Sequence, residues 1–169
     1  MNIVLIGYRG TGKSTVGKVL AARLGRPVVS TDTEIVRRAG LTVPEIVAQY
    51  GWDHFRDLES AVCRDFSVQD GLIIDTGGGA ILRPHNVEYL KKTGTLFWLT
   101  ASVATIASRI GHDTQRPSLT GTKSFVEEVE EVLAIRTPKY KEAADHVVST
   151  DGRSINQIVD AILALTILS

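Results

Sequence analysis

The run GYRGTGKS, residues 7–14, has the residue types that bind phosphate groups. It fits the pattern G-x-x-x-x-G-K-[ST] and stands between an apolar stretch and a helical pattern, which is the context that this motif requires. Glycines let the backbone curl until several N–H groups converge on phosphate oxygens at the positive end of the following helix. The residues that we expect to bind a nucleoside triphosphate are Gly10, Thr11, Gly12, Lys13, Ser14 and Thr15.

Two side chains of this run bring chemistry of their own. The ammonium group of Lys13 should reach the β and γ phosphates and stabilise negative charge as it shifts during transfer. The hydroxyl of Ser14 is expected to ligate Mg²⁺, a cation that prefers oxygen donors. The alternative is a glycine turn with a chance lysine and serine, but the strand and helix around the run argue against it. The motif is silent on the group that accepts the phosphoryl.

The elements that must position this loop are visible as alternating apolar runs and helical patterns. Strands are expected at 2–6, 26–30, 72–75, 95–100 and 146–150. Helices are expected at 13–24, 33–40, 43–51, 54–66, 102–110, 125–144 and 154–168. Strands rich in Val, Ile and Leu separated by helices predict an α/β fold, a five-stranded parallel sheet with helices on both faces. The length of 169 residues fits one domain, 1–169.

Composition excludes several classes of partner. The chain carries 19 basic and 19 acidic residues, so no net charge attracts nucleic acid or an anionic membrane. The start MNIVLIGYRG lacks the features of a signal peptide, and no apolar segment reaches the roughly 18 residues of a membrane span. The single cysteine, Cys63, cannot form an internal disulfide. We therefore expect a cytoplasmic protein with no nucleic-acid and no membrane partner.

The chain resembles shikimate kinases along nearly its whole length. The stretches that carry the resemblance are GYRGTGKST, STDTEI with the downstream RAG, HFRDLES, TGGGA, QRPSL and RTPKY. Each is weak alone, but their order and spacing make the resemblance specific. It implies a three-layer P-loop kinase fold with a substrate-binding segment at about 32–60 and a lid at about 111–124. It also implies ATP and Mg²⁺ as cofactors and shikimate as the small-molecule substrate.

The resemblance assigns three side chains to the acceptor. Asp32 would hydrogen-bond the hydroxyls of shikimate and is the candidate base for the attacking hydroxyl. By position alone, Asp32 could instead cap a helix that begins at Thr33, and both roles could hold. Arg56 and Arg136 match two carboxylate-binding arginines, whose guanidinium groups can bind a carboxylate through two parallel hydrogen bonds. Two solvated surface arginines are the alternative interpretation.

The resemblance also gives a role to residues around these side chains. Glu59, three residues after Arg56, lies on the same helical face and is expected to hold the arginine in place. In the run IIDTGGGAI, Gly77, Gly78 and Gly79 would let the substrate lie directly on the backbone, because any Cβ would prevent that approach. A glycine-rich turn without a ligand is the alternative.

One departure from the family pattern concerns the metal. The family usually has two aspartates after the second strand, and Ser30 stands in place of the first, which normally helps to hold magnesium. Asp75 ends the third expected strand, beside the strand of the phosphate loop, much as the magnesium-binding aspartate of other P-loop enzymes does. We hypothesise that Asp75 supplies, directly or through water, the negative charge that Ser30 lacks.

The polar segment HDTQRPSLTGTK, residues 112–123, has few apolar anchors, which is typical of a mobile surface loop. In the resemblance it belongs to the lid, whose Arg116 reaches the transferring phosphoryl group and would be both catalytic and nucleotide-binding. Arg109 and Arg153 stand where the family stacks arginines on adenine. The four histidines show no metal-ligand spacing.

The leading interpretation is a shikimate kinase, which transfers the γ-phosphoryl group of ATP to the 3-hydroxyl of shikimate and gives shikimate 3-phosphate and ADP. This reaction leads toward chorismate and the aromatic amino acids. A P-loop kinase of another small acceptor, a sugar acid or a nucleoside monophosphate, is the alternative enzyme. A non-catalytic nucleotide-binding regulatory protein is a third reading, which Ser30 keeps open. A monomer is expected from the resemblance.

Overall fold

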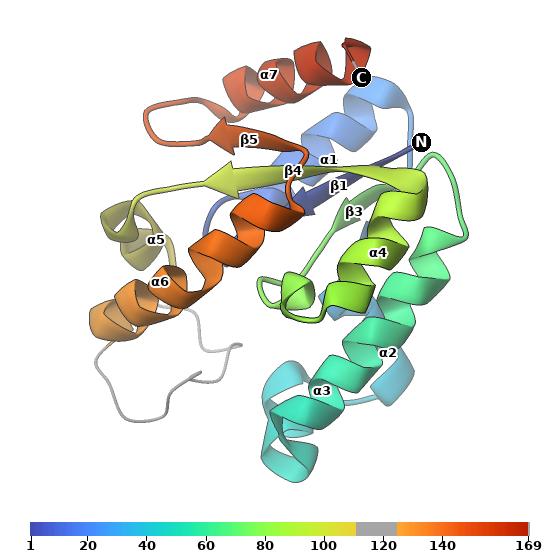
Figure 1. The fold of residues 1–169 in the computed structure, drawn as a ribbon, viewed down its shortest axis with the longest axis vertical. Helices are drawn as coiled ribbons and strands as arrows, with labels where there is room; N and C mark the ends of the chain where they lie inside the picture. Colours follow the sequence, from blue (N-terminus) through green and yellow to red (C-terminus); the bar gives the residue numbers. More distant parts are fainter. Residues whose placement is uncertain (111–124, 169) are drawn as a thin grey trace.

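The structure is a computed structural model, of which residues 1–110 and 125–168 are described. Its centre is a sheet of five parallel strands in the order β2-β3-β1-β4-β5 (Figure 1). The strands are β1 (Asn2–Ile6), β2 (Val28–Ser30), β3 (Ile73–Asp75), β4 (Gly94–Thr100) and β5 (His146–Ser149). The predicted α/β fold with a five-stranded parallel sheet is confirmed, because every described pair of strands runs parallel.

Helices cover both faces of this sheet (Figure 1). One face carries α1 (Lys13–Leu24) and α7 (Ile155–Ile167), and the other carries α2 (Thr31–Ala39), α3 (Val43–Ser67), α4 (Pro84–Thr93), α5 (Val103–Ile110) and α6 (Phe125–Ala143). Side chains of β1 alternate between two buried clusters: Ile3 and Leu5 pack toward α1 and α7, while Val4 and Ile6 pack toward the other helices. The alternation follows from the two-residue period of a strand.

Three local features differ from the sequence-based expectations. The structure adds α4 and a short 3-10 helix, η1 (Ala80–Leu82), which the apolar pattern did not reveal. The two stretches expected at 43–51 and 54–66 form one element, α3, with a kink at Gly51, whose φ is +86°. The interpretation of Asp32 as a helix cap is wrong: α2 begins at Thr31, and the Ser30 hydroxyl accepts the cap hydrogen bond from the Thr33 N–H at 3.3 Å.

The carboxyl ends of β1, β2 and β3 meet at one edge of the sheet, where ligands of parallel α/β folds bind. Asp75, the last residue of β3, is the register partner of Leu5 in β1 and of Ser30 in β2. The phosphate loop follows β1, and the triple glycine follows β3. The topology therefore brings these segments together. Within the described ranges, no helix has the length and apolar character that crossing a membrane requires.

Candidate active site

The phosphate loop curls as the motif predicts. Gly10 and Gly12 have φ values of +82° and +94°, a backbone conformation that residues with a Cβ rarely adopt. At Gly10 a Cβ would also lie 2.7 Å from Cγ2 of Ile110, so glycine is required for space as well. Lys13 is buried, and its Nζ donates hydrogen bonds to the carbonyl oxygens of Gly7 (2.7 Å) and Tyr8 (3.0 Å). The ammonium group thus lies against the loop that curls over the start of α1.

Ser14 and Asp75 are in direct contact at this edge. The Ser14 Oγ donates a hydrogen bond of 2.6 Å to Oδ2 of Asp75, which is only 8% exposed. Both residues line an open pocket, which we call the phosphate pocket. Its lining is Arg9, Gly10, Gly12, Lys13, Ser14, Thr15, Ser30, Asp32, Asp75, Thr76, Gly77, Gly78 and Ile110. A hydroxyl and a carboxylate beside a phosphate site are the hard oxygen donors that suit Mg²⁺.

A second pocket shares lining residues with the first, and we call it the acceptor pocket. Its lining is Tyr8, Arg9, Asp32, Val43, Trp52, Phe55, Arg56, Glu59, Gly77, Gly78, Gly79 and Arg136. The pocket combines apolar and aromatic walls with three arginines and two carboxylates. That composition fits a small anion whose ring packs against the apolar walls.

Arg56 is held from two sides within the acceptor pocket. Its Nη1 donates a 2.8 Å hydrogen bond to Oε1 of Glu59, a carboxylate with no exposed surface, and this confirms the expected contact. The guanidinium group also lies 5.2 Å from the ring centre of Trp52 and 5.3 Å from that of Phe55. Burial raises the pKa of Glu59, while the Arg56 charge acts to lower it.

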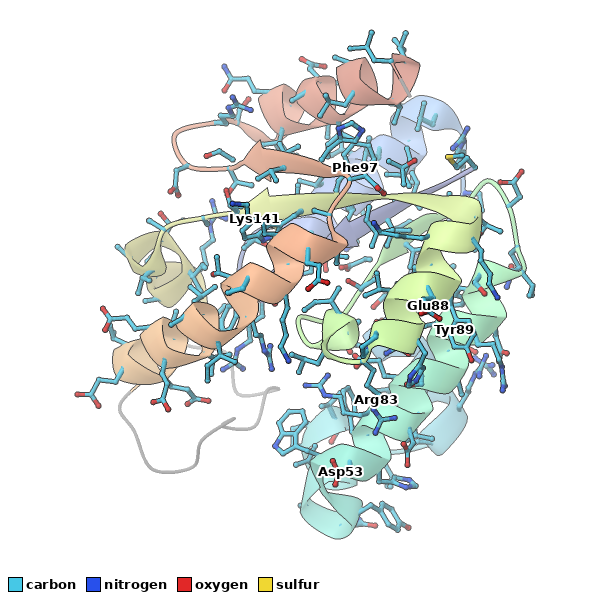
Figure 2. The ribbon with its side chains drawn as sticks, viewed as in Figure 1. Asp53, Arg83, Glu88, Tyr89, Phe97 and Lys141 are labelled. Atoms are coloured by element: carbon cyan, nitrogen blue, oxygen red, sulfur yellow. The ribbon has the colours of Figure 1, made fainter. Side chains whose placement is uncertain are left out.

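The segment of α3 that carries Arg56 is tied to the start of α4. Figure 2 labels Arg83, just before α4, and Asp53 on α3. The Arg83 guanidinium donates to Oδ1 of Asp57 at 2.6 Å and to the carbonyl oxygen of Asp53 at 3.4 Å. These bonds help to fix the part of α3 that forms the wall of the acceptor pocket.

Arg136 comes from α6, 80 positions after Arg56, and lines the same pocket. It is 8% exposed, and its guanidinium carbon lies 5.9 Å from the ring centre of Tyr8. One helical turn later, the Tyr140 hydroxyl donates a hydrogen bond to the carbonyl oxygen of Gly78. Burial raises the pKa of Tyr140 to about 12, so this hydroxyl keeps its proton at neutral pH. Helix α6 thus supplies an arginine to the pocket and also holds the backbone of Gly78. We call the run Gly77, Gly78 and Gly79 the glycine floor.

The triple glycine is needed for close approach rather than for an unusual turn, because none of the three has a positive φ. A Cβ at Gly77 would lie 2.7 Å from Oδ1 of Asp32. A Cβ at Gly79 would collide with the Arg56 guanidinium group. The Gly77 N–H is already bonded to Oγ1 of Thr31 at 2.9 Å. The glycines therefore make room for the site's own side chains as well as for a ligand.

The two pockets share one wall. Arg9, Asp32, Gly77 and Gly78 line both of them. A hydroxyl in the acceptor pocket would therefore meet Asp32 close to the phosphate loop. The arrangement suits direct phosphoryl transfer between two bound molecules, because such a transfer needs attacking and leaving oxygens in line.

Arg109 and Arg153, the two arginines expected to stack on adenine, lie outside the lining of the phosphate pocket. Arg109, at the end of α5, donates from Nη1 to the carbonyl oxygen of Gly10 at 3.0 Å. Arg153 is exposed in the loop between β5 and α7. Neither side chain lines the phosphate pocket. The expected lid at 111–124, with Arg116, lies outside the described residues.

Sequence reasoning missed several residues of the acceptor pocket. Tyr8 and Arg9 occupy variable positions of the phosphate motif, so the pattern gives them no role. A charged residue inside a phosphate-binding loop was the available signal for Arg9. Trp52 and Phe55, with Val43, form the apolar wall. Their signal was the aromatic pair beside Arg56, where one expected helix ends at 51 and the next begins at 54.

Comparisons with known proteins give one answer. The family model described as shikimate kinase matches residues 9–166. A protein named shikimate kinase from Nitratidesulfovibrio vulgaris is 44% identical over 170 residues, covering 99% of this chain and 96% of the relative. The shikimate kinase of Syntrophus aciditrophicus is 44% identical over 176 residues, covering 96% and 89%.

Solved structures agree with the sequence relatives. A shikimate kinase from Acinetobacter baumannii, solved in complex with shikimate, has a TM-score of 0.93 at 35% identity and covers 98% of this chain and 92% of its own. A gluconokinase from Sinorhizobium meliloti has a TM-score of 0.56 at 19% identity, with 96% of this chain and 89% of its own covered, and so shows likeness of fold alone. Because the family model and the sequence relatives span nearly the whole chain, the chain belongs to the shikimate kinase family.

Proposed function

We propose that this chain phosphorylates shikimate: it transfers the γ-phosphoryl group of ATP to the 3-hydroxyl and releases ADP. The observation that carries the proposal is the wall shared by the phosphate pocket and the acceptor pocket, with Asp32 in it. Family membership supports the choice of acceptor, and the relative from Acinetobacter baumannii was solved with shikimate. A ring with hydroxyls and one carboxylate suits a pocket that has both apolar walls and arginines.

The acceptor is oriented by its carboxylate. Arg56 and Arg136 approach the pocket from different helices, and a guanidinium group can bind a carboxylate through two parallel hydrogen bonds. Glu59 and the Trp52 and Phe55 rings hold the Arg56 guanidinium group, so little side-chain entropy remains to be lost on binding. With the carboxylate fixed at that end, a ring hydroxyl is directed to the shared wall.

The chemical step then needs one base and stabilisation of phosphate charge. Asp32 accepts the proton of the attacking hydroxyl as its oxygen bonds to the γ phosphorus. The bond from that phosphorus to the β–γ bridging oxygen breaks, and its electron pair leaves with ADP. Lys13 and the N–H groups of the phosphate loop stabilise the charge that develops on the leaving phosphate. The position of Asp32 in the lining of both pockets supports this role.

Magnesium fits the residues at this edge. We propose that Ser14 and Asp75 hold it, because their oxygens are 2.6 Å apart and both line the phosphate pocket. When bound, Mg²⁺ neutralises phosphate charge and orients the β and γ groups. Ser30 lines the same pocket but offers only a neutral oxygen, which also serves as the cap of α2.

The decisive experiment is an ADP-release assay with ATP and Mg²⁺, run with shikimate, gluconate, a nucleoside monophosphate or no acceptor. We expect stimulation by shikimate alone, with shikimate 3-phosphate identified by mass spectrometry. No stimulation above the acceptor-free rate would refute the proposal. Stimulation by gluconate or the nucleotide instead would assign the chain to another acceptor.

A further inference from the structure

Arg9 is a cation at the boundary between the two pockets. Among the described residues, the charged side chains that line both pockets are Arg9 and Asp32. Lys13 lines only the phosphate pocket, whereas Arg56 and Arg136 line only the acceptor pocket. Arg9 therefore supplies the positive charge of the shared wall, between the region for the phosphates and the region for the acceptor's carboxylate.

The backbone fixes where this side chain begins. Arg9 lies between Gly7 and Gly10, in the curled part of the phosphate loop. A Cβ built on Gly78 would lie 3.3 Å from the backbone nitrogen of Arg9, so the phosphate loop packs closely against the glycine floor. The side chain thus starts at the junction of the pockets and does not have to reach it from a distant element.

The guanidinium groups of Arg9 and Arg56 differ in their hydrogen-bond and ion-pair partners. The Nε of Arg9 is buried and has no hydrogen-bond partner among residues 1–110 and 125–168, and no carboxylate of these residues forms an ion pair with the guanidinium group. Arg56, in contrast, is paired with Glu59. A buried donor without a partner is rare and unfavourable, and an arginine cannot lose its charge to avoid that cost. An anionic oxygen of a ligand would satisfy the group.

We propose that Arg9 is a catalytic residue that binds the non-bridging oxygens of the phosphoryl group as it passes from nucleotide to acceptor. The inference rests on the proposed function. In that step the bond from the acceptor oxygen to phosphorus forms, the bond to the β–γ bridging oxygen breaks, and the proton goes to Asp32. Arg9 exchanges no proton and no electrons. It adds positive charge at the one place that the phosphoryl group must cross.

The test compares Arg9→Met, which keeps length and removes charge, with Arg9→Lys, which keeps charge. Arg64→Met is the matched control, because Arg64 is 60% exposed and lines neither pocket. We expect Arg9→Met to lower kcat about 100-fold, the usual effect of losing one donor to transition-state charge. Arg9→Lys should recover part of that loss. The KM for shikimate should change by less than about threefold if the group acts mainly in the transition state.

Two kinetic outcomes would overturn the inference. One is a kcat of Arg9→Met within about threefold of that of the control. The other is a large rise in the shikimate KM at unchanged kcat, which would make Arg9 a ligand of the carboxylate. Thermal unfolding of all three variants shows whether a loss of rate reflects a loss of fold.

Nucleotide binding separates this inference from the proposed function. Calorimetry without acceptor gives the affinities for ADP and for the non-hydrolysable ATP analogue AMPPNP. We expect Arg9→Met to weaken AMPPNP binding and to leave ADP binding unchanged, because only the former has a γ group. An unchanged ratio of the two affinities would count against Arg9. If the wild-type chain failed to phosphorylate shikimate, the proposed function would fail, and this ratio would still decide the role of Arg9.

Discussion

Ser30 and Asp75 are register partners at the carboxyl ends of the neighbouring strands β2 and β3. The family pattern has a carboxylate at the first position, and this chain has one at the second. The carboxylate at Asp75 is in contact with the Ser14 hydroxyl, at 2.6 Å. The ends of these two strands therefore place a neutral hydroxyl at Ser30 and a carboxylate at Asp75 beside the phosphate loop.

Asp75→Asn should weaken Mg²⁺ binding by about tenfold or more, because an amide keeps the shape and loses the charge. The measurement is the Mg²⁺ concentration that gives half-maximal rate, together with the Mg²⁺ dependence of ADP affinity by calorimetry. Adding Ser30→Asp to this variant should restore part of the loss, because it returns the charge to the partner position. An unchanged Mg²⁺ dependence in Asp75→Asn would mean that another group holds the metal.

Arg136→Ala should raise the KM for shikimate about 100-fold and leave the KM for ATP nearly unchanged, since a charged hydrogen bond to the acceptor is lost. Initial rates over a grid of both substrates give the two constants. Arg64→Ala, on the exposed side of α3, serves as the control. Equal changes in both constants would argue against a carboxylate at Arg136.

Glu59→Gln keeps the volume of a fully buried side chain and removes the charge that pairs with Arg56. We expect about a tenfold rise in the shikimate KM and a lower melting temperature, because Arg56 loses its buried counter-charge. Glu88→Gln, at an exposed position on α4, is the control (Figure 2). A variant with wild-type KM would show that the aromatic rings alone hold Arg56.

Gly79→Ala tests the space that the glycine floor leaves for Arg56. The φ of Gly79 is −102°, so alanine introduces no backbone strain, but its Cβ would displace the guanidinium group. The KM for shikimate should rise about tenfold, because one charged contact with the acceptor is misplaced. In an Arg56→Ala background the same substitution should have little further effect. Fully additive effects would mean that the glycine acts on something other than Arg56.

Glu34 gives a prediction for pH. Hydrogen bonds from Arg37 and Arg38 lower the pKa of Glu34 from 4.5 to about 2. A lowered carboxyl pKa stabilises the folded state above 4.5, and this contribution is lost as pH falls from 4.5 to about 2. Glu34→Gln should therefore destabilise the protein near neutral pH, by at most about 1 kcal/mol because the pairs are at the surface. The free energies of unfolding of the wild-type protein and of Glu34→Gln, measured with denaturant, should converge as the pH falls toward 2. A difference that does not change with pH would contradict this prediction.

The sequence predicted features that depend on short-range order. The phosphate loop, the parallel sheet and the contact of Arg56 with Glu59 follow from local spacing and from strand chemistry. The closeness of Asp75 to the phosphate loop followed from the common edge at which parallel strands end.

Other features depend on packing between segments that are far apart in the sequence, and a local pattern of residues does not predict such packing. Ser30 caps α2 because β2 ends one residue before the helix, and this excluded a cap at Asp32. Helix α4 has few buried side chains and therefore a weak apolar signal. The orientation of Arg9 depends on how the phosphate loop packs against Gly78, two segments far apart in the sequence. The prediction that Arg136 and Arg56 serve the same binding site came from the family resemblance and not from local spacing.

The topology has a consequence for how acceptor choice can evolve. Much of the acceptor pocket comes from one uninterrupted stretch, α2 and α3, inserted between β2 and β3 at the border of the sheet. Substitutions at Val43, Trp52 or Phe55 can reshape the pocket without touching the loop that holds the phosphates. A library of variants at those three positions would therefore change which acceptors bind while the ATP-binding loop stays intact. Selection from such a library could change the acceptor and keep ATP as the phosphoryl donor.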